Sequence, residues 1–176
     1  MITLITGGAR SGKSAYAESR AGEHENVLYI ATARADGDEE MIRRIEAHKK
    51  RRPASWRTVE RDYDLAETIH EEDAALLDCV TVMLSNYLWN YSVEGEEVDE
   101  EKIEGLLMEE LSDLIAAARR KDCDLFIVTN EVGSGIVPMH PVSRAFRDMQ
   151  GRINQRLAQA ADEVYACISG IPVKIK

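Results

Sequence analysis

Eight residues near the N-terminus, GGARSGKS, have the types and spacing that bind a nucleoside triphosphate. They follow an apolar strand pattern, precede a helical one and match the P-loop consensus G-x-x-x-x-G-K-[ST]. Glycines in such a loop let successive backbone N–H groups face a phosphate chain, and the helix N-terminus adds further donors. Lys13 would reach the β- and γ-phosphates, and the Ser14 hydroxyl would coordinate Mg²⁺. The predicted nucleotide-binding residues of this loop are Gly7, Gly8, Ala9, Arg10, Ser11, Gly12, Lys13 and Ser14.

A second magnesium ligand is expected at the end of a neighbouring strand. Asp78 closes the apolar run AALLD and is the stronger candidate. Glu131 follows the run DLFIVTN and could equally serve as a base towards a substrate hydroxyl. Either residue could also be a solvated acid in a loop. Motors, GTPases, small-molecule kinases and transporters all use a P-loop, so the loop alone does not identify the reaction.

A histidine and four consecutive cations stand in the stretch RIEAHKKRRP (44–53) of a chain whose formal net charge is -10. At helical spacing Met41, Ile45 and His48 share one stripe, which is typical of a partly buried packing histidine. Cations at a helix C-terminus also complement the helix dipole. A functional interpretation stays open, because nearby cations lower the pKa of an imidazole and leave a neutral nitrogen able to attack phosphorus.

Length and composition indicate one cytoplasmic globular domain spanning residues 1–176. The acidic balance argues against a nucleic-acid partner, which requires a broad positive field. No stretch approaches the roughly 18 consecutive apolar residues of a membrane span. Three dispersed cysteines within apolar runs are expected to be buried free thiols, as in a reducing compartment: Cys79, Cys123 and Cys167.

Apolar runs and helical patterns alternate along the chain. Strands are predicted at 2–6, 27–33, 74–80, 124–130 and 163–169, and helices at 14–22, about 38–51, 65–72, 82–91, 99–121 and about 143–161. Alternation of this kind implies an α/β fold, P-loop NTPase-like (RecA-like), with a mostly parallel sheet and helices on both faces. The C-terminal stretch is predicted to form an antiparallel hairpin with the two-residue turn Gly170-Ile171, its last strand at the sheet edge.

Two motifs are far narrower than the P-loop: RI-x-x-H-x-x-x-R-P-x-x-W-x-T-x-E around His48, and NEVG-x-GIVP from Asn130. With LYIATA, LLDCVTVMLSN and SGIPVKIK, they resemble the bifunctional adenosylcobinamide kinase/adenosylcobinamide-phosphate guanylyltransferases of cobalamin biosynthesis, nearly end to end. The resemblance implies that ATP or GTP phosphorylates adenosylcobinamide. GMP from GTP would then pass through a guanylyl-histidine, here on His48, to adenosylcobinamide phosphate. It also implies a homotrimer.

The same resemblance suggests further site residues. Five would line the GTP site: Thr32, Ala33, Arg34, Glu60 and Asp78. Four would supply charge for the nucleotide phosphates: Lys49, Lys50, Arg51 and Arg52. The Glu60 carboxylate could accept N1–H and N2–H of guanine, although a surface acid at a strand end is the alternative. The loop 130–148 is expected to help hold the corrinoid through Asn130, Glu131, Gly133 and Gly135.

Two other functions stay open from the sequence. A plain P-loop small-molecule kinase, in which His48 only packs, would form no covalent nucleotide. A nucleotide-gated regulator or RNA-binding protein using the KKRR run is disfavoured by the net acidity. The leading hypothesis requires Mg²⁺, with GTP and ATP as substrates.

Overall fold

The computed structural model describes residues 1–34, 42–43, 46, 49, 52–92 and 97–176. Within them, one sheet has the strand order β3-β2-β4-β5-β1-β6-β7. Its strands are β1 (Ile2–Gly7), β2 (Val27–Ala31), β3 (Arg57–Glu60), β4 (Ala74–Asp78), β5 (Asp124–Val128), β6 (Glu163–Ile168) and β7 (Ile171–Lys174). Every pairing is parallel except β6 with β7, which is antiparallel. The topology confirms the expected α/β fold with a C-terminal hairpin.

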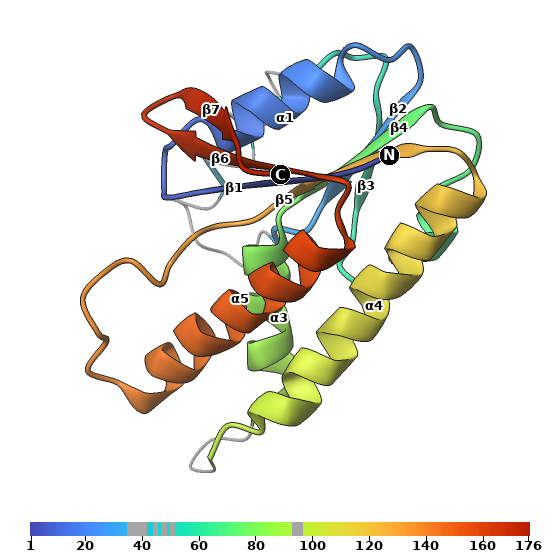
Figure 1. Ribbon diagram of the computed structural model, residues 1–176. Coiled ribbons are helices and arrows are strands. Elements are labelled where there is room, and N and C mark those ends of the chain that lie inside the picture. Colours follow the sequence, from blue (N-terminus) through green and yellow to red (C-terminus); the bar gives the residue numbers. More distant parts are fainter. Residues whose placement is uncertain (35–41, 44–45, 47–48, 50–51, 93–96) are drawn as a thin grey trace.

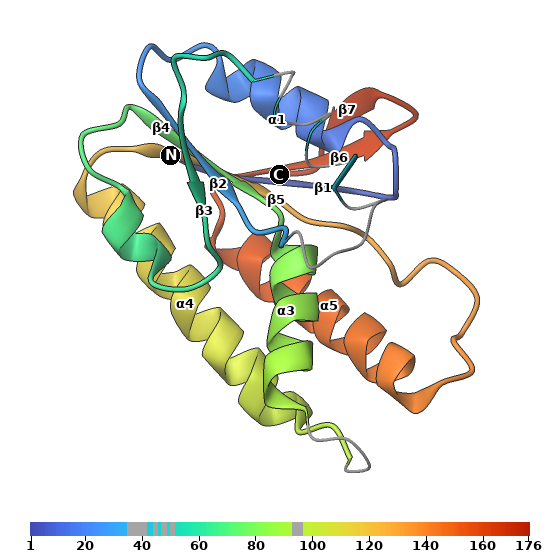
Figure 2. The same cartoon turned by 180° about the vertical axis from the view of Figure 1, so that it is seen from behind.

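Helices cover both faces of the sheet. Helix α1 (Lys13–Ala21) lies on one face, and α3 (Val80–Tyr91), α4 (Glu100–Arg120) and α5 (Pro141–Ala160) lie on the other (Figures 1 and 2). Side chains alternate accordingly along each strand. Leu4, Ile30 and Leu77 join the core beneath α3, α4 and α5, whereas Ile5 and Tyr29 join the core beneath α1. No described helix is long and apolar enough to cross a membrane.

Three expectations about local structure are wrong. The predicted helix 65–72 is only a 3-10 turn, η1 (Leu65–Thr68), because Ile69 already has an extended backbone. Strand β3 was not predicted: it has four residues and its side chains alternate between exposed and half-buried. The hairpin turn is Ser169-Gly170 rather than Gly170-Ile171, since Ile171 pairs with Ile168. Ser169 and Gly170 have φ values of 52° and 85°, as a type I′ turn requires.

The predicted helix 38–51 falls largely outside the described residues. Its described residues, Ile42, Arg43, Glu46 and Lys49, have helical backbone conformation. The three cysteines are buried free thiols, as expected.

The carboxyl ends of the parallel strands meet at one edge of the sheet. The P-loop follows β1, Thr32 follows β2, Asp78 ends β4 and Asn130 follows β5. Ligands of open parallel sheets bind at this edge. The fold therefore gathers chain segments that lie far apart in the sequence.

Candidate functional site

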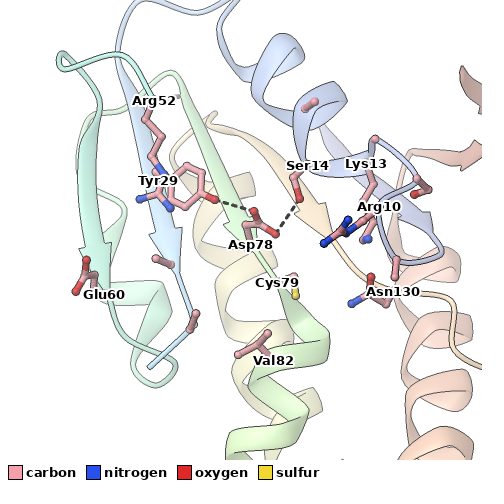
Figure 3. Close-up of a pocket in the computed structure, with 16 residues that line it drawn as sticks. Arg10, Lys13, Ser14, Tyr29, Arg52, Glu60, Asp78, Cys79, Val82 and Asn130 are labelled. Carbon is pink, nitrogen blue, oxygen red and sulfur yellow. Dashed lines mark hydrogen bonds between the residues drawn. The ribbon is translucent and has the colours of Figure 1, made fainter. Parts of the chain in front are cut away.

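A cavity of about 590 Å³ opens at this edge, between the P-loop and the ends of β2 and β4 (Figure 3). Its volume is in the range of pockets that hold small molecules. Basic, acidic, amide and apolar side chains all line it. The lining residues are Ala9, Arg10, Ser11, Gly12, Lys13, Ser14, Ala15, Tyr29, Ala31, Ala33, Arg52, Glu60, Asp78, Cys79, Val82 and Asn130.

The P-loop needs glycine at two of its positions. A Cβ added to Gly7 would lie 2.5 Å from Ser11 Oγ, and one added to Gly12 would lie 3.0 Å from the Cα of Gly170. Gly12 also has a φ of 94° and forms the N-cap of α1 without any side-chain hydrogen bond. The amides of the first helical turn are therefore not capped by a side chain, as suits a phosphate site.

Lys13 lies within this loop and is buried. Its Nζ donates to the carbonyl oxygen of Gly8 at 3.0 Å, so the ammonium folds back over the loop that would hold the phosphates. Every predicted P-loop residue from Ala9 to Ser14 lines the cavity. The structure thus places this part of the prediction in a single concave surface.

Asp78 faces the P-loop across the cavity. Ser14 Oγ donates to Asp78 Oδ1 at 3.4 Å, and the Tyr29 hydroxyl donates to Asp78 Oδ2 at 2.7 Å (Figure 3). Ser14 and Asp78 offer only oxygen donors, which fits Mg²⁺ held by one or two protein groups together with nucleotide phosphates. The sequence analysis missed Tyr29. The sequence does contain an indication, a tyrosine within an apolar strand, because a buried tyrosine hydroxyl needs a hydrogen-bond partner.

Burial raises the pKa of the Tyr29 hydroxyl, and the charge of Asp78 raises it further. Tyr29 is therefore a neutral donor towards the carboxylate. Burial also raises the pKa of the Cys79 thiol, to about 12, although this residue lines the cavity. Cys79 is accordingly no nucleophile at neutral pH.

Arg52 and Glu60 lie on the β2–β3 side of the cavity and also line a second hollow of about 370 Å³. The guanidinium carbon of Arg52 lies 3.4 Å from the centroid of the Tyr29 ring. Lys49 Nζ forms an ion pair with Glu60 Oε1 at 2.5 Å. Two of the four predicted cations therefore lie beside the cavity. His48, Lys50 and Arg51 lie outside the described residues.

The segment Thr32-Ala33-Arg34 is held by contacts with its neighbours. The Thr32 hydroxyl donates to the Cys79 carbonyl at 2.9 Å and accepts from the Cys79 amide at 2.8 Å. Ala33 lines the cavity, but the Arg34 guanidinium binds both oxygens of Asp62 at 2.8 Å. Asp62 is only 2% exposed and also accepts from Asn86. The sequence analysis missed Asp62, which no motif marks.

Of the predicted corrinoid residues, only Asn130 lines the cavity. The Glu131 amide donates to the Gly7 carbonyl at 3.0 Å, while its carboxylate accepts from the Gly133 amide at 3.1 Å. Glu131, Gly133 and Gly135 are exposed. The loop therefore begins at the cavity and then runs out over the surface.

Comparisons with known proteins show which family the chain resembles along its whole length. A family model described as cobinamide kinase / cobinamide phosphate guanyltransferase matches residues 3–175. The "Bifunctional adenosylcobalamin biosynthesis protein CobU" of Escherichia coli (strain K12) is 48% identical over 182 residues, and that of Salmonella typhimurium is 49% identical. Both alignments cover 100% of each chain. The protein CobP of Pseudomonas aeruginosa is 40% identical, with 100% of this chain and 98% of the relative covered.

Among solved structures, the RadB recombinase aligns with a TM-score of 0.49 at 15% identity, covering 94% of this chain and 73% of that one. No functional inference follows from similarity at that level. The sequence relatives match over the whole length, and the family model leaves out only three of the 176 residues. The chain therefore belongs to the cobinamide kinase / cobinamide phosphate guanyltransferase family.

Proposed function

We propose that this chain phosphorylates adenosylcobinamide with ATP or GTP, and then transfers GMP from GTP to adenosylcobinamide phosphate. The product would be adenosylcobinamide-GDP. Family membership makes the chain a bifunctional enzyme of cobalamin biosynthesis, with kinase and nucleotidyltransferase activities. The observation that carries the proposal is the cavity in which the P-loop, Asp78 and Arg52 meet.

In the kinase step, the P-loop amides and Lys13 would hold the nucleotide phosphates. Ser14 and Asp78 would hold Mg²⁺, which supplies charge neutralisation at the phosphate oxygens when it is bound. The contact of 3.4 Å between the Ser14 hydroxyl and Asp78 supports this pairing. Arg10 also lines the cavity and adds positive charge on the P-loop side.

In the guanylyl-transfer step, a neutral nitrogen of His48 would attack the α-phosphorus of GTP. A P–N bond forms, and the bond from this phosphorus to the pyrophosphate oxygen breaks. An oxygen of adenosylcobinamide phosphate then attacks the same phosphorus, which releases neutral His48. Support comes from its described neighbours, since Lys49 pairs with Glu60 and Arg52 lines the cavity.

Glu60 would select guanine by accepting its N1–H and N2–H groups, and Asn130, Glu131, Gly133 and Gly135 would contact the corrinoid. Glu60 lines the cavity at the end of β3, and Asn130 lines it near Lys13 (Figure 3). Residues 32–34 would complete the nucleotide site, with Lys50 and Arg51 adding charge. By the family resemblance, we also propose that residues 1–176 form one domain, which works in the cytoplasm as a homotrimer.

The test follows both products by mass spectrometry after incubation with adenosylcobinamide, Mg²⁺ and GTP. Wild type should form adenosylcobinamide-GDP, whereas His48→Asn should stop at adenosylcobinamide phosphate. Lys13→Ala should lower phosphorylation by about a hundredfold or more, because its charge would stabilise the transferring phosphoryl group. Lys102→Ala and His70→Asn, at exposed positions away from the cavity, are the matched controls. Normal GDP-product formation by His48→Asn would refute the covalent route.

A further inference from the structure

We propose that Tyr29 is a positioning residue that orients the carboxylate of Asp78 for the metal through its hydroxyl and supports the guanidinium of Arg52 for a nucleotide phosphate through its ring. The inference rests on the magnesium site proposed above and concerns how that site is held. Tyr29 is 1% exposed and lies in the middle of β2. Although it is buried, the Tyr29 side chain lines the cavity.

The hydroxyl of Tyr29 fixes how the Asp78 carboxylate is turned. It donates to Oδ2 at 2.7 Å, while Oδ1 faces the Ser14 hydroxyl at 3.4 Å. Because the Tyr29 hydroxyl holds Oδ2, the carboxylate keeps Oδ1 turned towards Ser14 of the P-loop. Groups that orient metal ligands in this way commonly change metal affinity by about 10–100-fold when they are removed.

The ring of Tyr29 carries Arg52. The guanidinium carbon lies 3.4 Å from the ring centroid, within the range of a cation–π contact. Nε and Nη1 of Arg52 are buried and have no hydrogen-bond partner within the described part of the chain. Buried donors without partners are unfavourable, and an anion would satisfy them. Arg52 lines the same cavity as the P-loop, so a nucleotide phosphate group fits that requirement.

One side chain therefore contacts both halves of the site through different atoms, which allows the two contacts to be separated. Tyr29→Phe removes the hydrogen bond to Asp78 and keeps the ring beneath Arg52. Arg52→Met removes the charge and leaves the hydroxyl in place. If Tyr29 only filled space in the core, these two substitutions would not have separate effects on metal and nucleotide binding.

The experiment measures binding of guanosine 5′-[α,β-methylene]triphosphate, whose α–β bridge resists attack at the α-phosphorus, by calorimetry, in EDTA and across a Mg²⁺ series. The Mg²⁺ midpoint is the Mg²⁺ concentration at which half of the metal-dependent gain in nucleotide affinity is reached. For Tyr29→Phe, we expect this midpoint to rise about tenfold. Its affinity in EDTA should stay within about twofold. Arg52→Met should weaken binding in EDTA about tenfold and leave the Mg²⁺ midpoint unchanged.

Tyr165→Phe is the matched control, because the Tyr165 hydroxyl also donates to a carboxylate, that of Glu163 at 3.1 Å, away from the cavity. In a second comparison, Tyr29→Phe should have no added effect on the Mg²⁺ midpoint of Asp78→Asn. An unchanged midpoint in Tyr29→Phe, or an equal shift in Tyr165→Phe, would overturn the proposal. Wild-type binding without any Mg²⁺ dependence would overturn it too.

The binding measurement uses neither corrinoid nor turnover. If wild type fails to form adenosylcobinamide-GDP but Tyr29→Phe still shows the expected shift in Mg²⁺ midpoint, the proposed function is contradicted and the role of Tyr29 stands. If products form normally while the Mg²⁺ midpoint of Tyr29→Phe matches that of wild type, the role of Tyr29 alone fails.

Discussion

At the scale of single residues, two carboxylates organise the polar side chains beside the cavity. Asp78 could be predicted from the sequence because it ends an apolar run at the sheet edge. Asp62 could not, since its partners Arg34 and Asn86 are 28 and 24 residues away and no spacing rule connects them. Tyr29 was similarly hidden, because it reads as one more apolar residue of a strand.

Asp62→Asn should lower the free energy of unfolding by about 2 kcal/mol, because Arg34 and Asn86 would lose a charged acceptor in a buried place. The expected loss is below that of a fully buried pair, since the Arg34 side chain is 37% exposed. Urea unfolding measures the difference. Asp64→Asn is the control: the Asp64 side chain is 60% exposed and its carboxylate pairs only with Arg61 among the contacts described, so we expect a loss of at most about 0.5 kcal/mol. Equal effects of the two substitutions would contradict the account.

At the scale of elements, the β6–β7 hairpin supports the P-loop. The Gly170 amide donates to the Ser11 carbonyl at 2.9 Å, and a Cβ added to Gly12 would lie 3.0 Å from the Gly170 Cα, so the hairpin would have to shift by a few tenths of an ångström. The sequence predicted both elements but not their contact, because the P-loop lies near the start of the chain and the hairpin near its end. The wrongly placed turn had the same origin. A glycine next to an apolar residue fits a type II′ turn, whereas pairing of Ile168 with Ile171 selects Ser169-Gly170.

Gly12→Ala should therefore cost about 2 kcal/mol of folding stability, from the positive φ of 94° and the tight contact of the added methyl group with the hairpin. Weaker nucleotide binding should accompany the loss, because the loop must shift to admit the methyl group. Gly8→Ala is the matched control, since a Cβ there meets no atom within 4 Å. Its expected cost is below about 0.5 kcal/mol. Thermal unfolding and nucleotide titration of both variants would check this, and equal losses would speak against the hairpin contact.

Strand β3 is held at the sheet edge by a charge contact that sequence patterns do not reveal. Arg57 Nε donates to the Glu72 carboxylate at 2.7 Å, and its Nη2 donates to the Thr68 carbonyl. Burial alone would raise the pKa of Glu72, but the His70 amide and the Arg57 guanidinium hold that pKa below its usual value. A short strand with exposed alternate residues is thereby attached to the segment preceding β4.

Because the folded-state pKa of Glu72 is below its unfolded value of about 4.3, its ionised form stabilises the fold above that pH. This stability is lost as the pH falls through the folded pKa. Glu72→Gln should thus be less stable than wild type at pH 7, with the difference narrowing between about pH 5 and pH 3. Urea unfolding across this range, with the exposed Glu71→Gln as control, measures it. A difference that does not depend on pH would argue against the carboxylate's role.

At the scale of the whole molecule, alternation of apolar runs and helical patterns was enough to predict a parallel α/β sheet with helices on both faces. Four buried strands, β1, β2, β4 and β5, were found because each side of the sheet is covered there, which makes their runs mostly apolar. Strand β6 was also found, although only Val164 and Cys167 of its six residues are buried. The edge strand β3 was not predicted, and η1 was predicted as a longer helix over 65–72, because long-range contacts fix both of them. The sequence predicted the P-loop half of the site, and the polar network behind it needed the structure.

The outer strand β7 carries Ile171 and Val173, and Ile175 follows directly after it; their side chains are 65%, 46% and 65% exposed. An apolar edge strand of this kind is usually covered in solution. In keeping with the proposed homotrimer, sedimentation equilibrium should give three times the 19.7 kDa mass of one chain. A mass of one chain across the micromolar range would contradict that assembly.

The central claim, a guanylyl group carried on His48, is tested most directly with GTP labelled at the α-phosphorus. The protein is incubated with Mg²⁺ and labelled GTP, denatured, and assayed for bound label that is released by acid and retained in alkali, as a phosphoramidate requires. We predict label on wild type and on His70→Asn, and none on His48→Asn. Absence of label from wild type that binds GTP, or label that persists in His48→Asn, would contradict the account.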